Sequence, residues 1–173
     1  MNAATEFDLG PLTWVKGEID LALTRAVEAL VQHELNGDAT QLRFCRTHVH
    51  QVNGALSIVG LDGVTQVTES LEALLSALEE QRLQFTAEIS ITLTQAIAAI
   101  RKYLDDLVAG EPNQPLRLFL VYSVLATARG LSSCSPADLF FPDLSLRPPK
   151  RSVPVAPLSA EQLAALPPEF RAL

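Results

Sequence analysis

The strongest constraint on the fold is the spacing of apolar residues between positions 39 and 59. They recur at alternating intervals of three and four residues, at Leu42, Cys45, Val49, Val52, Leu56 and Val59. This spacing keeps them on one side of an α-helix, as in helices that pack in a bundle. The alternation of apolar and polar residues that indicates β-strands is almost absent from the chain. The sequence therefore predicts an all-α protein.

Three other segments show the same helical spacing, and helices are predicted there over residues 11–34, 64–81 and 86–110. A fifth helix is predicted over 115–130, after Pro115 and up to Gly130. Gly60 is expected to end the helix over 39–59, and Thr86 is expected to cap a later one. A short turn is expected at Asp62-Gly63. Long amphipathic helices with short connections favour antiparallel neighbours. We expect an up-and-down antiparallel bundle with a four-helix core and an additional helix, in which Trp14 and Tyr103 cap the core.

The C-terminal part differs from the rest because prolines interrupt any regular element. They stand at Pro142, Pro148, Pro149, Pro154, Pro157, Pro167 and Pro168. The predicted domains are therefore a helical bundle over residues 9–145 and a Pro-rich linker and tail over 146–173. Within the tail, residues 146–158 are expected to be extended, and 159–166 could form one short helix.

Composition narrows the possible partners. The chain carries 13 Lys and Arg against 20 Asp and Glu, a formal charge of −7, which argues against nucleic acid. The apolar, uncharged run at residues 118–128 is far shorter than the roughly 20 residues of a membrane span. Two distant cysteines without metal spacing, and a start unlike a signal peptide, predict a cytoplasmic protein.

His50 is the residue most suited to chemistry. It follows Val49 by one residue, so its side chain turns about 100° away from the buried side of the helix and toward solvent. Gly54 lies one turn later, although glycine costs roughly 1 kcal/mol in a helix interior. Without a side chain there, the imidazole stays accessible, and its neutral form is a nucleophile. The residues alone thus favour His50 as an acceptor that another protein must reach.

Other residues near His50 have expected supporting roles. Thr47, Gly54 and Ser57 lie on its ridge and, together with Asn53, would form the supporting surface. The flanking residues Phe44, Gln51 and Ile58 would dock a partner. His48 lies on a different face, so the two histidines cannot share a metal ion, and no metal is expected. On the helix over 64–81, an acidic rim is possible, but a solvated face is favoured for Glu69, Glu72, Glu79 and Glu80.

His50, Gly54 and Gly60 reproduce the H-x-x-x-G-x-x-x-x-x-G pattern of histidine phosphotransfer (HPt) domains. Over roughly residues 9–145 the chain resembles the N-terminal region of CheA-like hybrid histidine kinases of the type IV pilus chemotaxis (ChpA/PilL) type. The segments that carry this resemblance are RTHVHQVNGALSIVGL, ESLEALLSALEEQ, ATARGLSS and ADLFFPDLSL. The resemblance implies that His50 accepts a phosphoryl group from an ATP-binding kinase domain. It also implies transfer of that group to an aspartate on a response-regulator receiver domain.

Two residues depart from the family pattern. Asn53 stands where the family usually has Lys or Arg, and Leu56 is larger than usual. The alternative is therefore a degenerate HPt-like module that is not phosphorylated and serves in protein interaction or scaffolding. The chain has no glycine-rich nucleotide loop, so no cofactor or enzyme activity of its own is expected, although the parent protein would be a histidine kinase. The sequence leaves the oligomeric state open.

Overall fold

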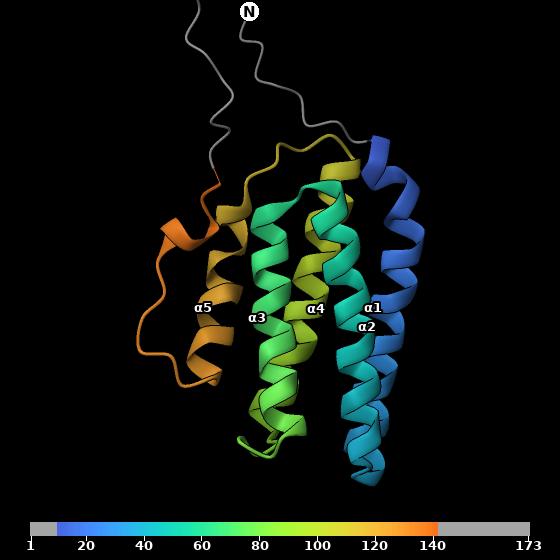
Figure 1. Ribbon diagram of the computed structural model, residues 1–173, viewed down its shortest axis with the longest axis vertical. Coiled ribbons are helices and arrows are strands. Elements are labelled where there is room, and N and C mark those ends of the chain that lie inside the picture. Colours follow the sequence, from blue (N-terminus) through green and yellow to red (C-terminus); the bar gives the residue numbers. More distant parts are fainter. Residues whose placement is uncertain (1–9, 142–173) are drawn as a thin grey trace, which may run out of the picture. The chain divides into compact units, whose positions relative to one another are not determined.

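The computed structural model describes residues 10–141, and in that range the chain consists of helices joined by loops, without a strand (Figure 1). The all-α prediction is confirmed. No helix in this range has the length and apolar character needed to cross a membrane. The predicted Pro-rich tail over residues 146–173 lies outside the described residues. The elements are α1 (Gly10–Asn36), α2 (Ala39–Val59), α3 (Asp62–Glu79), α4 (Ala87–Val108), the 3₁₀ turn η1 (Pro115–Leu118), α5 (Phe119–Ala128) and the 3₁₀ turn η2 (Pro136–Leu139).

Four long helices close a ring in chain order. α1 packs on α2, α2 on α3, α3 on α4, and α4 returns to α1, while α5 lies outside this ring against α3 and α4 (Figure 1). Only Gly37 and Asp38 separate α1 from α2, and only Gly60 and Leu61 separate α2 from α3. Connections this short make consecutive helices antiparallel. The predicted up-and-down bundle with one additional helix is confirmed.

The core consists of the apolar residues that recur at helical spacing in the sequence. The α2 residues Leu42, Cys45, Val49, Val52 and Leu56 are all buried, and the equivalent stripes of α1, α3 and α4 meet them. Burial raises the pKa of the Cys45 thiol to about 12, so it stays protonated and packs as a small apolar side chain.

The two aromatic residues expected to cap the core behave differently. Tyr103 is buried, and its hydroxyl donates to Asn113 Oδ1 at 2.6 Å. The prediction for Trp14 is wrong, because its side chain is 89% exposed. It follows the buried Leu12 by two residues, about 200° around the helix, and therefore faces away from the core.

The helix that carries His50 is capped at both ends. The Asp38 side chain accepts a hydrogen bond from the Thr40 N–H at 2.9 Å, which satisfies an N–H group of the first turn. At the other end, Gly60 has φ +78°, a left-handed conformation that favours glycine, and it ends the helix as predicted. These caps make α2 a well-defined support for the site.

The expected turn at Asp62-Gly63 is wrong, since both residues lie in the first turn of α3. Gly63 is buried, and a Cβ atom there would overlap Cβ and Cγ of Pro115. The missing side chain lets η1 approach α3 directly. Glycine serves here for close packing instead of for a turn.

Candidate functional site

The His50 ring is held at one nitrogen and open at the other. Its side chain is 71% exposed at the middle of α2, and its Nδ1 atom lies 3.0 Å from Oε1 of Glu72 on α3. An ionised carboxylate can only accept a hydrogen bond, so Nδ1 is the nitrogen that carries the proton. In the neutral ring, Nε2 then keeps its lone pair, and among residues 10–141 it has no hydrogen-bond partner. The arrangement presents a nucleophilic nitrogen to solvent.

Gly54 leaves the space beside this ring open. A Cβ atom built at Gly54 would meet nothing within 4 Å, so the glycine is not there for a close contact between helices. Helical side chains lean toward the N-terminus, and a larger residue at position 54 would therefore lie over His50. The glycine keeps a path to the imidazole free.

An ion-pair cluster lies on the same side of α2, closer to its N-terminus. Glu79 Oε1 accepts from Arg43 Nε at 2.9 Å, and Glu79 Oε2 accepts from Arg46 Nε at 2.7 Å. The hydrogen bond from Arg43, together with that from Arg46, outweighs burial and lowers the pKa of the Glu79 carboxyl. Arg43 and His50 are seven residues apart, as are Glu79 and Glu72. The two pairs thus follow one antiparallel register between α2 and α3.

The supporting residues named from the sequence surround His50 on α2. The hydroxyl groups of Thr47 and Ser57 donate to the backbone carbonyls of Arg43 and Asn53, both at 2.9 Å. Asn53 itself is half-buried, and its buried Oδ1 atom has no partner among the described residues. Leu56, the second departure from the family pattern, points into the core and is fully buried. Its size therefore does not obstruct the imidazole.

The three residues proposed for docking line the outer side of α2. Phe44, Gln51 and Ile58 follow one another at intervals of seven residues, and all are exposed, Ile58 to 87%. His48 is half-buried, and its Nδ1 atom lies 3.2 Å from Oε1 of Gln51. Within residues 10–141 there is no group of three or more His, Cys, Asp or Glu side chains that could hold a metal ion.

The sequence interpretation missed the role of the α3 carboxylates. It favoured one solvated face for the four glutamates, but the structure divides them. Glu72 and Glu79 reach across to α2, whereas Glu69 and Glu80 are exposed to solvent. The matching seven-residue spacing in the two helices was the available signal. This spacing could not identify the contacts by itself, because the register between α2 and α3 must be known first. Short-range periodicity does not provide that register.

Comparison with known proteins gives one family and no individual relative. A family model described as the Hpt domain matches residues 12–108. The matched range contains more than half of the chain and includes His50, Glu72 and the whole of α2 and α3. It ends at the last residue of α4, so η1, α5 and η2 lie beyond it. A search of curated proteins found no match.

Proposed function

The chain belongs to the Hpt domain family, and from this premise we propose that His50 is the phosphoacceptor of a phosphorelay. It would receive a phosphoryl group from a kinase domain and pass it to an aspartate of a response-regulator receiver domain. Phosphorelay signalling with such partners is the general role of Hpt domains. The observation that carries the proposal is the exposed His50 ring, which is bound through Nδ1 to Glu72 and has no partner at Nε2 among the described residues.

The chemistry follows from this hydrogen bond. The Nε2 lone pair attacks the phosphorus of the donor, the N–P bond forms, and the bond to the leaving oxygen breaks. The ring gains positive charge as the N–P bond forms, and the carboxylate of Glu72 stabilises that charge through Nδ1–H. Transfer onward reverses the process: a receiver carboxylate oxygen bonds the phosphorus and the N–P bond breaks. Glu72 is a positioning residue, since it acts through His50.

Arg43 and Arg46 supply positive charge close to the acceptor. The His50 side chain leans toward the N-terminus of α2, over the turn that holds Arg46 and Thr47. Each arginine uses Nε for Glu79, and among residues 10–141 their Nη groups have no hydrogen-bond partner. We infer that these groups attract the phosphoryl oxygens in place of the charge that Asn53 lacks.

The outer side of α2 is suited to a partner that must approach His50 closely. Gly54 leaves the flank of the ring open, and the exposed side chains of Phe44 and Ile58 provide apolar contact area on either side of Gln51. A receiver domain and a kinase domain both need this access. We infer that the two partners use the same side of α2 in turn.

The biological setting is proposed from the sequence resemblance alone. The segments around residues 46–61, 69–81 and 126–146 resemble those of the CheA-like kinases in type IV pilus chemotaxis. We therefore infer a role in the control of pili and twitching motility, in the cytoplasm, as part of a histidine kinase.

The direct test is incubation of the chain with a kinase domain and ATP labelled at the γ-phosphate. We expect an acid-labile label on the wild type and none on His50→Gln. The His48→Gln variant is the matched control and should keep its label. Label that persists on His50→Gln, or the absence of label from wild type with an active kinase, would overturn the proposal.

Asn53 supports a second candidate, an Hpt-like module that binds partners without being phosphorylated. An amide carries no charge to hold the phosphoryl group, unlike the Lys or Arg usual at this position. The variant Asn53→Lys separates the two candidates. If wild type stays unlabelled while Asn53→Lys becomes labelled, the fold has kept a competent histidine and lost only the charge, which favours the second candidate.

A further inference from the structure

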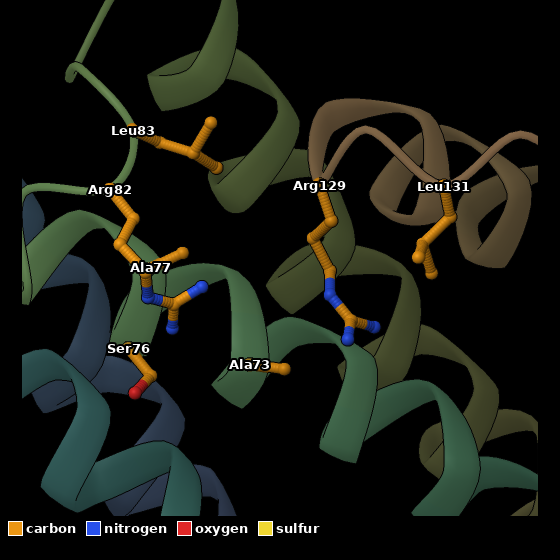
Figure 2. A pocket seen from close by; sticks show the side chains of 7 residues that line it. All are labelled: Ala73, Ser76, Ala77, Arg82, Leu83, Arg129 and Leu131. Atoms are coloured by element: carbon orange, nitrogen blue, oxygen red, sulfur yellow. The ribbon is translucent and has the colours of Figure 1, made fainter.

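A hollow of about 380 Å³ lies on the bundle surface between α3, the loop after α3 and the end of α5 (Figure 2). Ala73 and Ala77 of α3 line it, and their small side chains leave the space open. Arg82 enters from the loop and Arg129 from the end of α5. Figure 2 shows the two guanidinium groups on either side of Ala73, both extended toward α3. Two cations therefore face one concave surface.

Arg129 lacks a carboxylate partner within residues 10–141. It is half-buried, and its Nη1 atom donates to Ser70 Oγ at 3.2 Å. A guanidinium has five N–H donors, and a partly buried charge is costly without an opposite charge. Most other cations in this range do bind Asp or Glu, namely Lys16, Arg43, Arg46, Arg82, Lys102 and Arg117. The site at Arg129 thus favours an anion from outside this part of the chain.

Arg82 provides a second group of donors. Its Nε atom donates to Oε2 of Glu80 at 2.7 Å, and its Nη groups have no hydrogen-bond partner in the described range. Oε1 of the same carboxylate accepts from Ser76 Oγ at 2.7 Å. Glu80 partly compensates the charge of Arg82 and holds its side chain at the rim. Arg129 is therefore the main anchor, and Arg82 is an additional one.

The apolar surroundings indicate what kind of anion fits. Leu83 and Leu131 line the hollow beside the arginines, and Leu131 is 49% exposed. The surface continues along α5, whose ten residues carry no charge and include Leu120, 74% exposed. A free phosphate ion would contact only the guanidinium groups. A protein segment could cover the leucines as well, since exposed apolar area adjacent to charge is typical of interaction sites.

We propose that this hollow binds an acidic segment of a partner protein, whose carboxylates pair with Arg129 and Arg82. The apolar side chains of the segment would then cover Leu83, Leu131 and the exposed side of α5. Within residues 10–141 no hydrogen bond or ion pair joins these residues to His50, whose ring binds Glu72 on the same helix as Ala73. The protein could hold one partner here while another reaches His50.

The test uses the full chain and synthetic peptides, followed by NMR of the arginine Nε–H groups. The probe is the amphipathic peptide acetyl-LEELLEELL-amide, and its neutral counterpart has Gln in place of Glu. We expect the acidic peptide to shift the Arg129 signal saturably, and the affinity to fall as salt is added. The neutral peptide should bind about tenfold more weakly, the effect of losing one charge-assisted hydrogen bond.

Variants assign the binding to this hollow. Arg129→Gln should weaken acidic-peptide binding about tenfold, and the exposed Arg82→Gln, which leaves the packing intact, should weaken it measurably. Arg25→Gln on α1, which removes an exposed arginine elsewhere, should bind like wild type, as should His50→Gln. Unchanged binding by Arg129→Gln and Arg82→Gln would overturn the proposal. So would equal binding of the neutral peptide, or an Arg129 signal that responds to inorganic phosphate but not to the peptide.

Discussion

His50 stands at the middle of α2 between two residues that define its chemistry. Glu72 binds Nδ1 at 3.0 Å, which fixes the ring and assigns the lone pair to Nε2. Gly54 has no side chain, and the space where its Cβ would lie is empty to 4 Å, so the ring stays accessible. The spacing of apolar residues in α2 was enough to predict that His50 is exposed and that Gly54 leaves one side of its ring open, because both features depend on this helix alone. The contact with Glu72 joins two helices, and the periodicity of α2 contains no information about it.

Replacing Glu72 by Gln tests the anchor. Glutamine retains an oxygen that accepts from Nδ1–H but has no negative charge to stabilise the ring during attack. We expect phosphorylation of His50 to slow roughly tenfold, the value of one charge-assisted hydrogen bond, with little change in stability. Rates from a kinase assay provide the measurement. The exposed Glu69→Gln on the same helix is the control, and equal rates for both variants would contradict the role of Glu72.

Two substitutions at Gly54 separate stability from access. Gly54→Ala should raise the free energy of unfolding by about 1 kcal/mol, because alanine is the better helix former and its Cβ has room. It should leave phosphorylation nearly unchanged. Gly54→Leu should fold equally well but slow phosphorylation at least tenfold, since its side chain would lie over His50. Urea denaturation and the kinase assay measure the two effects, and full activity in Gly54→Leu would show that the open flank is unnecessary.

The site is formed by two helices, α2 and α3, together. Their two-residue connection, Gly60 and Leu61, makes them antiparallel, and the Glu79 cluster and the Glu72 contact follow the same register. The sequence predicted both helices because their apolar stripes are regular. It misplaced the start of α3, since Asp62-Gly63 has the composition of a turn, and only the tertiary contact with Pro115 explains the glycine.

Gly63→Ala tests that contact. The added Cβ would overlap the ring of Pro115, and the free energy of unfolding should fall by about 1–3 kcal/mol, the usual cost of overpacking. Gly17→Ala is the matched control, because a Cβ in that α1 position meets nothing within 4 Å. The control should be neutral or stabilising in urea denaturation. A Gly63→Ala protein as stable as wild type would mean that η1 does not pack closely on α3.

The pH dependence of stability tests the Glu79 cluster. Arg43 and Arg46 lower the pKa of Glu79 in the folded state. The Glu79 carboxylate therefore stabilises the fold at pH values above 4.5, the ordinary pKa of a glutamate. The contribution disappears as the pH falls through the lowered pKa of the folded state. Wild type should therefore exceed Glu79→Gln in unfolding free energy at pH 7, by about 1 kcal/mol or less for this partly exposed cluster. Urea denaturation of both proteins from pH 7 to pH 3 measures the difference, and a difference independent of pH would contradict the ion pairs.

At the scale of the whole molecule, α1 to α4 form a closed bundle, and the Hpt family model covers this bundle without α5. The sequence predicted the bundle because every core stripe repeats regularly. It predicted that Trp14 caps the core, although the position two residues after the buried Leu12 faces outward. It also missed the hollow at Arg129, which combines residues from α3, a loop and α5 that are distant in the chain.

Across the described part of the chain, the three histidines differ in environment, and this contrast leads to the decisive measurement. His33 is half-buried against Phe85, and its Nδ1 atom lies 2.9 Å from the Asp38 carbonyl oxygen. His48 is half-buried beside Gln51, and only His50 is exposed with its Nδ1 atom bound to a carboxylate. A small phosphoryl donor such as phosphoramidate can reach any accessible imidazole without a kinase.

The measurement is the ¹H–¹⁵N NMR spectrum of the imidazole rings of the full chain before and after treatment with phosphoramidate. The account predicts that a phosphoryl group appears on Nε2 of His50, and that His33 and His48 remain unmodified. The Glu72→Gln variant should react at the same nitrogen but more slowly. Modification at Nδ1 of His50, reaction at His48 instead, or no reaction at His50 would contradict the account.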